Sequence, residues 1–166
     1  GYNTALGDGA LKSNTTASYS TAIGYQTLYS QTTPTYANTA VGAIAGYANT
    51  TGDSSVYIGV AAGTANTTGS KNTVVGHQAL QANTTASNNT AVGYQALYSN
   101  TTNGPNTAVG YLAGYATTGN GFIQAFGARA LQANTTGIYN NAFGYQASVA
   151  NTTGSYNTSI GDQSLY

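Results

Sequence analysis

A glycine recurs at nearly constant spacing along this chain, each time directly after a short apolar segment. Ten such residues, here called the repeat glycines, are separated by intervals of 17 residues, with a single interval of 18 between Gly24 and Gly42. They are Gly7, Gly24, Gly42, Gly59, Gly76, Gly93, Gly110, Gly127, Gly144 and Gly161. A fixed period of this length is typical of repeat proteins, in which each unit packs only against its neighbours. The repeat therefore limits the chain to a stack of small similar units.

The consensus repeat reads Asn-Thr-Ala-Val-Gly-Tyr-Gln-Ala-Leu-Tyr-Ser-Asn-Thr-Thr-Gly-Ser-Tyr, and its apolar positions indicate β structure. Leu stands four positions after most repeat glycines, but Gly replaces it in three coils. In two of these, at Gly46 and Gly114, a large apolar residue stands two positions earlier, at Ile44 and Leu112. Residues two apart share one face of a β-strand, whereas a helix places them about 200° apart. The exchange favours strands.

We predict an all-β fold, a parallel β-solenoid or β-roll of ten coils of about 17 residues with two short strands per coil. The first strand ends before the repeat Gly, the second covers Gln-Ala-Leu-Tyr after it, and Asn-Thr-Thr-Gly-Ser forms the loop. At about 4.8 Å per coil, the rod is roughly 45–50 Å long. Residues 1–166 form one array, which we expect to be cut from a longer one.

The pattern also predicts which residues face inward. The apolar residue before each repeat Gly is expected to form an internal ladder, so that Val92→Asp opens the stack while Tyr94→Asp is milder. Repeated Ala residues on either side of the Gly indicate close packing, against either the opposite wall of a thin coil or a neighbouring subunit. The extra residue of the 18-residue coil lies near Pro34, so the segment 31–37 is expected to bulge outward while the flanking strands keep their register.

The low charge of the chain excludes several functions. Its titratable residues, besides tyrosine, are Lys12, Lys71, Arg129, Asp8, Asp53, Asp162 and His77. So few cations give no footprint for nucleic acid, and no apolar run suits membrane insertion. Asp8 and Asp162 share a repeat position about nine coils apart, roughly 43 Å, so they form no catalytic pair. We expect no enzyme activity, no catalytic residues, no cofactor and no metal site.

The motif Asn-Thr-Ala-(Val/Leu/Ile)-Gly-Tyr-Gln-Ala-Leu-Tyr-Ser-Asn-Thr-Thr-Gly resembles the repeat arrays of phage tail-fibre and surface-fibre proteins that precede an endosialidase-type intramolecular chaperone. More distantly, it is similar to the head repeats of trimeric autotransporter adhesins. The resemblance implies a fibre that is extracellular, on a cell-surface appendage or on a virion. It also implies a homo-oligomer, with a trimer favoured over a filament, and attachment to a host-surface glycan. The 17-residue period is longer than the adhesin repeat.

Three surface rows are candidates for contact with a partner. Tyr94, Tyr98, Tyr111 and Tyr115 belong to tyrosine rows that suit sugar contact as well as packing. Seven Asn-Thr-Thr sequences are glycosylation acceptor patterns, although the same Asn residues suit turns: Asn14, Asn49, Asn66, Asn83, Asn100, Asn134 and Asn151. A Thr stands eight positions after each of the first nine repeat glycines, which brings ice binding into consideration, but adjacent Thr side chains point to opposite faces.

Three function classes follow: a passive structural shaft or filament, a carbohydrate- or receptor-binding adhesin segment, and an ice-binding β-solenoid. Near-identity of the coils favours the shaft, because a specific receptor site needs a local departure from the repeat. The largest departure is the segment 119–126, Gly-Asn-Gly-Phe-Ile-Gln-Ala-Phe. A binding site is best sought there.

Overall fold

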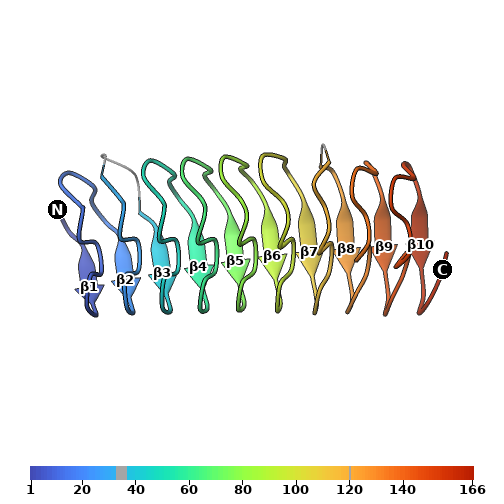
Figure 1. Ribbon diagram of the computed structural model, residues 1–166, viewed down its shortest axis with the longest axis horizontal. Coiled ribbons are helices and arrows are strands. Elements are labelled where there is room, and N and C mark those ends of the chain that lie inside the picture. The colour runs from blue at the N-terminus through green and yellow to red at the C-terminus, as the bar shows by residue number, and fades with distance from the viewer. Residues whose placement is uncertain (33–36, 120) are drawn as a thin grey trace.

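The computed structural model describes residues 1–32, 37–119 and 121–166. It is a single stack of coils with one three-residue strand in each (Figure 1). The strands are β1 Thr4–Leu6, β2 Thr21–Ile23, β3 Thr39–Val41, β4 Val56–Ile58, β5 Thr73–Val75, β6 Thr90–Val92, β7 Thr107–Val109, β8 Gln124–Phe126, β9 Asn141–Phe143 and β10 Thr158–Ile160. The predicted all-β solenoid is confirmed.

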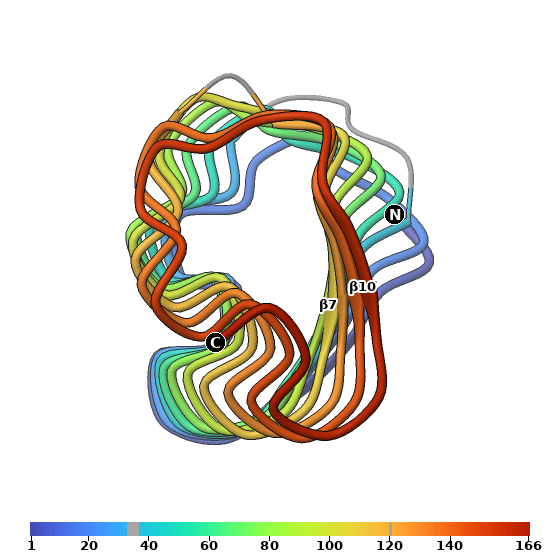
Figure 2. The ribbon, with the colours of Figure 1, turned by 90° about the vertical axis from the view of Figure 1, so that its right-hand side faces the viewer.

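The ten strands form one parallel sheet in sequence order, β1 to β10. Each strand pairs with its equivalent in the next coil, as Thr90, Ala91 and Val92 of β6 pair with Thr107, Ala108 and Val109 of β7. Seen along the stack, the coils share one closed outline, each displaced a little from the one before it, and the strands occupy one wall of it (Figure 2). No helix able to cross a membrane occurs in the described part of the chain.

The 18-residue coil leaves the sheet undisturbed. Thr21 of β2 pairs with Thr39 of β3, and Ile23 pairs with Val41, so the register is kept across the longer interval as predicted. Residues 33–36, where the bulge around Pro34 is predicted, lie outside the described residues.

The prediction of a second strand per coil is wrong. After each repeat Gly the backbone forms consecutive turns, in which Gln95 and Leu97 have φ values of 52° and 50°. Hydrogen bonds between coils nevertheless continue, from Gln95 N–H to the His77 carbonyl at 3.0 Å and from Leu97 N–H to the Ala113 carbonyl at 3.0 Å. A coil of 17 residues has to turn back sharply on itself, and the left-handed residues produce that turn while keeping the ladder.

The predicted inward face of the first strand is also wrong. Ala91 is fully buried, whereas Val92 is only partly buried and lies on the outer face. The same holds along the stack, where Ile58 is 40 % exposed beside the fully buried Tyr57. Two bulky rows do not fit across so thin a coil, so small Ala side chains line the strand wall. Of the two explanations for the Ala rows, packing against the opposite wall is the one observed.

The core is a single continuous cluster of Ala and Leu side chains. It contains most of the Ala residues two before and three after the repeat glycines, with Leu28, Leu80, Leu97 and Leu131, and in some coils Tyr57, Val74 or Ile123. The repeat glycines are required by this close stacking. Gly93 has a φ of 132°, and a Cβ there would overlap the carbonyl oxygen of Gly110 in the next coil.

The exchange of apolar residues that indicated β structure takes place between opposite walls of the coil, and not between two positions of one strand. Where Gly46 and Gly63 replace the core Leu, the ring of Tyr57 fills the space from the opposite wall. At Gly114 the Ile123 side chain does the same, with its Cδ1 3.1 Å from the position of a Cβ. The β conclusion holds, but the residues that compensate are not the ones expected from spacing.

Candidate functional surfaces

The four tyrosines proposed as ligand contacts form two separate stacked pairs. The ring centroids of Tyr94 and Tyr111 are 5.4 Å apart, and those of Tyr98 and Tyr115 are 5.1 Å apart. Tyr94 and Tyr111 are exposed, whereas Tyr98 and Tyr115 are half-buried. The rings of each pair pack against each other along the stack. Of the two pairs, the first has the more exposed ring surface.

A further aromatic row lies five residues before the repeat glycines, at the last position of the consensus repeat, and the sequence analysis did not single it out as a surface row. Phe122 and Tyr139 stack at 5.0 Å with 11° between their ring planes, and Tyr139 stacks on Tyr156 at 5.1 Å. All three rings are exposed. The central coils carry other residues at this position, including Pro105, which hides the row in the sequence. Alignment of the last three coils alone would have shown it.

Most of the Asn residues proposed as glycan acceptors are inside the coil. Five are fully buried: Asn49, Asn66, Asn83, Asn100 and Asn134. Asn49 Nδ2 donates to the Gly52 carbonyl at 3.0 Å, and its Oδ1 accepts from the Gly52 N–H at 2.8 Å. The partly exposed Asn14 and Asn151 likewise donate to the carbonyl three residues on. A buried nitrogen in such a bond has no room for a glycan, which favours the turn alternative.

A second amide ladder joins neighbouring coils through the Asn four residues before the repeat Gly. The side-chain oxygen of Asn72 accepts the backbone N–H of Asn89 at 2.9 Å, and that of Asn89 accepts the N–H of Asn106 at 2.9 Å. These buried side chains satisfy backbone groups that have no strand partner. The ladder stabilises the stack and offers nothing to a ligand.

The predicted threonine row also bonds within the stack. Thr67 Oγ1 donates to the Thr84 carbonyl at 2.9 Å, and Thr84 Oγ1 donates to the Thr101 carbonyl at 3.2 Å. The row lies in a turn and not on a strand. A different threonine row, including Thr73, Thr90 and Thr107, lies on the outer face of the sheet. The other outward-facing residue of each of these strands is the aliphatic one that precedes the repeat Gly. The outer face of the sheet therefore carries one Thr row and one aliphatic row, and not two Thr rows.

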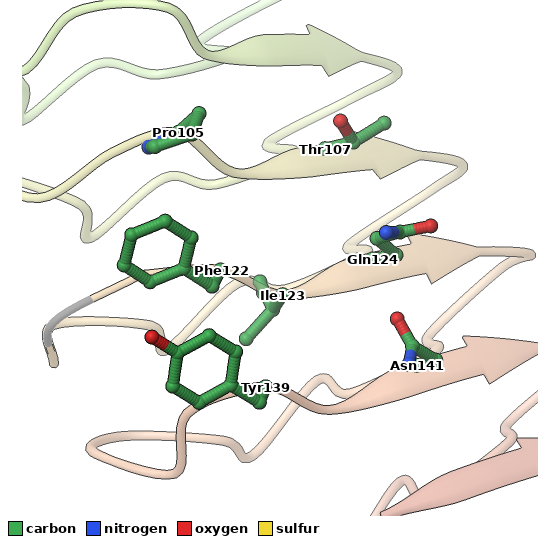
Figure 3. Close-up of a pocket in the computed structure, with 7 residues that line it drawn as sticks. All are labelled: Pro105, Thr107, Phe122, Ile123, Gln124, Tyr139 and Asn141. Atoms are coloured by element: carbon green, nitrogen blue, oxygen red, sulfur yellow. The ribbon is translucent and has the colours of Figure 1, made fainter. Parts of the chain in front are cut away.

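The segment that departs most from the repeat borders an open cavity of about 330 Å³ outside β7, β8 and β9 (Figure 3). Phe122, Ile123 and Gln124 of that segment contribute to the lining. The remaining lining residues come from the two neighbouring coils: Pro105, Thr107, Tyr139 and Asn141. The sequence located the segment, but the residues from the neighbouring coils are brought to it only by the stacking.

Within the described residues, no three His, Cys, Asp or Glu side chains are grouped as a metal ion would require. No protein-family model matches the chain, and it matches neither a curated protein nor a solved structure.

Proposed function

We propose that the chain is a structural, non-enzymatic segment of a fibre located outside the cell, on a cell-surface appendage or on a virion. The observation that carries this proposal is the unbroken register of ten strands over the whole described length. Each coil adds about 4.8 Å of length and pairs with the one before it in the same strand register. Such an arrangement suits a part whose task is to span distance.

The bonds between coils suit a shaft that resists unfolding and proteolysis. Sheet hydrogen bonds are accompanied by the Asn72–Asn89–Asn106 ladder on the inside and by the threonine bonds on the turns. Opening one coil breaks all of these on both of its sides. The stack therefore offers few flexible backbone segments for a protease to enter.

The shaft is proposed to associate with further copies of itself, with a trimer as the favoured state. The residue directly before each repeat Gly forms an outer row, here called the pre-glycine row, in which Ile23 is 36 % and Ile58 is 40 % exposed. Val75, Val92 and Val109 continue it. Because the row has the same period in every copy, two parallel copies side by side match along their whole length. A continuous row of partly exposed aliphatic side chains favours such contact.

Sedimentation equilibrium of the chain and of the triple variant Val75→Asp/Val92→Asp/Val109→Asp tests association. The chain is expected to sediment as an oligomer at micromolar concentration. The variant is expected to sediment as a folded monomer, since like charges along the row repel across the contact. The triple variant Thr68→Asp/Thr85→Asp/Thr102→Asp, at exposed positions outside the sheet, controls for added charge. A folded monomeric parent would refute the association.

An adhesin role is the alternative, and the cavity beside β8 is the observation that favours it. The four tyrosines proposed from the sequence, Tyr94, Tyr98, Tyr111 and Tyr115, remain candidate contacts for a host-surface glycan. Binding of a glycan lost in Tyr94→Ala and Tyr111→Ala would assign the function to that row.

A further inference from the structure

We propose that the cavity outside β7, β8 and β9 is a binding site for a neutral, extended oligosaccharide, of the class of β-1,4-linked hexoses. This inference goes beyond the shaft function, and it requires that the outer face of β7, β8 and β9, which also carries Val109 and Phe126 of the pre-glycine row, stays uncovered by a second copy. It rests on three features of the site: aromatic surface, amide groups without a partner among the described residues, and a change of interior residues in the same coils.

The aromatic surface is supplied by Phe122 and Tyr139. Their ring centroids are 5.0 Å apart with nearly parallel planes. Rings in full face contact would lie closer, at the 3.5–4.0 Å of carbon–carbon contact, so this pair is offset. The offset leaves part of each ring face at the surface, and the two rings are 44 % and 43 % exposed. The apolar face of a sugar ring packs on such a surface.

The free amide groups belong to Gln124 and Asn141, which occupy the position held by Thr in most other coils. Neither side chain makes a hydrogen bond to another described residue. Amides elsewhere on the surface pair with each other, as Gln95 Nε2 does with Gln78 Oε1 at 2.8 Å. In Figure 3, Gln124 and Asn141 lie one above the other beside the two rings. Each presents two N–H donors and an acceptor, which suits hydroxyl groups.

The site coincides with a change inside the same coils. Ile123 stands where the Asn ladder would continue, and although its N–H still donates to Asn106 Oδ1 at 3.2 Å, its side chain passes no bond to the next coil. Gly114 and Thr117 replace the usual Leu and Asn opposite it, and the Thr117 hydroxyl is buried without a partner. The coil thus gives up internal hydrogen bonds where its surface gains rings and amides. Buried side-chain atoms without a partner also occur in ordinary coils, at Asn83 Oδ1 and Asn100 Nδ2, so the interrupted Asn ladder is what sets this coil apart, as is expected at a functional position.

The residues that line the cavity indicate which kind of sugar it binds. None of the seven lining residues is charged, so the site offers nothing to a sulfated or carboxylated sugar. Each of the two coils supplies one aromatic ring and one amide side chain, and the coils are about 4.8 Å apart. This spacing is close to the length of one hexose in an extended chain. Successive sugar rings can therefore lie on Phe122 and Tyr139 in turn, with Gln124 and Asn141 bonding their hydroxyl groups.

Titration calorimetry with three hexasaccharide probes tests the site: β-1,4-linked glucose, β-1,4-linked N-acetylglucosamine, and α-1,4-linked galacturonate as the acidic comparison. Saturable binding of at least one neutral probe, at least tenfold tighter than the acidic one, is expected. Phe122→Ala is expected to weaken binding about tenfold. The double variant Gln124→Thr/Asn141→Thr restores the residue of the other coils, so it keeps the fold while weakening binding by a similar factor.

Tyr94→Ala removes an exposed stacked ring from a different row and is the matched control. Unchanged affinity in this variant supports the assignment, and an equal loss overturns it. Absence of saturable binding of both neutral probes, or preference for the acidic one, also overturns it. If Phe122→Ala dissociates an oligomer and no probe binds, the surface is a contact between copies, and the proposal is wrong.

Discussion

The ring of Tyr57 occupies the space that a Leu side chain would need at Gly63, four residues after the repeat glycine of the same coil. Tyr57 stands where other coils have Ala, and Gly63 stands where they have Leu. The two departures compensate across the interior, so that the total core volume of the coil is kept. This relationship makes the packing of the coil directly testable.

Exchange of these two residues should show strong coupling. Tyr57→Ala leaves a cavity and is expected to cost about 3–5 kcal/mol. Gly63→Leu overfills the coil and is expected to cost about 1–3 kcal/mol. The double variant recreates the common pair, and Leu97 shows that Leu is accommodated at a φ of 50° in this position. Urea unfolding should find it more stable than the Tyr57→Ala variant. Additive losses would mean that the two side chains do not share one space.

Tyr57 also predicts a specific loss of stability in alkali. Burial raises the pKa of its hydroxyl from 10.0 to about 12, and the nearby Ser55 and Asn66 side chains lower it only in part. Between these values the unfolded chain releases the proton while the folded chain holds it, so stability falls as pH rises. The slope is about 1.4 kcal/mol per pH unit. Above pH 10 the free energy of unfolding of the parent should fall relative to that of the Tyr57→Phe variant. Below pH 9 the free energies of the two proteins should change with pH in parallel.

The inward face of the strand can be checked by a pair of neighbouring substitutions. Ala91→Asp places a charge in the closed interior and is expected to cost several kcal/mol or to open the stack. Val92→Asp places the same charge on the outer face, where water reaches it, and is expected to cost much less. Thermal unfolding followed by circular dichroism distinguishes them. A larger loss at Val92 would restore the inward face expected from the sequence.

The internal amide ladder predicts that a single buried Asn carries measurable stability. Asn72→Ala removes the oxygen that accepts the Asn89 N–H, which stays buried without a partner. A loss of about 1–3 kcal/mol is expected. Thr85→Ala, an exposed change in the next turn, is the control and should stay within about 0.5 kcal/mol. Equal effects of the two substitutions in urea unfolding would contradict a structural role for the ladder.

No thermal hysteresis is expected from this chain. The turn threonines donate their hydroxyls within the stack, and the sheet presents a Thr row beside an aliphatic row. Nanolitre osmometry at millimolar protein measures the freezing gap. A gap abolished by Thr67→Tyr/Thr84→Tyr/Thr101→Tyr or by Thr73→Tyr/Thr90→Tyr/Thr107→Tyr would support ice binding through the turn or the sheet, respectively, and would contradict the shaft.

The period alone predicted the stack and the register across the longer coil. It did not predict the inward face, because the larger Val92 was expected to be buried in preference to Ala91. What decides is the width of a closed 17-residue coil, which spacing does not reveal. The turns after the repeat glycines were mistaken for strands because left-handed residues such as Gln95 and Leu97 carry no sequence mark.

The candidate site was predictable only in part. The departure of residues 119–126 from the repeat marked the location, and Phe122 and Gln124 lie within it. Tyr139 and Asn141 follow about 17 residues later and read as ordinary variation until stacking places them beside the first pair. Contacts between coils are invisible in a linear reading unless equivalent positions of successive coils are compared.

The length of the rod tests the central claim most directly. Residues 76–160 are five complete coils, and repeating them once in the chain continues the register from Ile160 into Gly76. Small-angle X-ray scattering should give an unchanged cross-section and a particle longer by about 24 Å, at about 4.8 Å per added coil. A wider particle of unchanged length would contradict an in-register stack that acts as the shaft of a fibre.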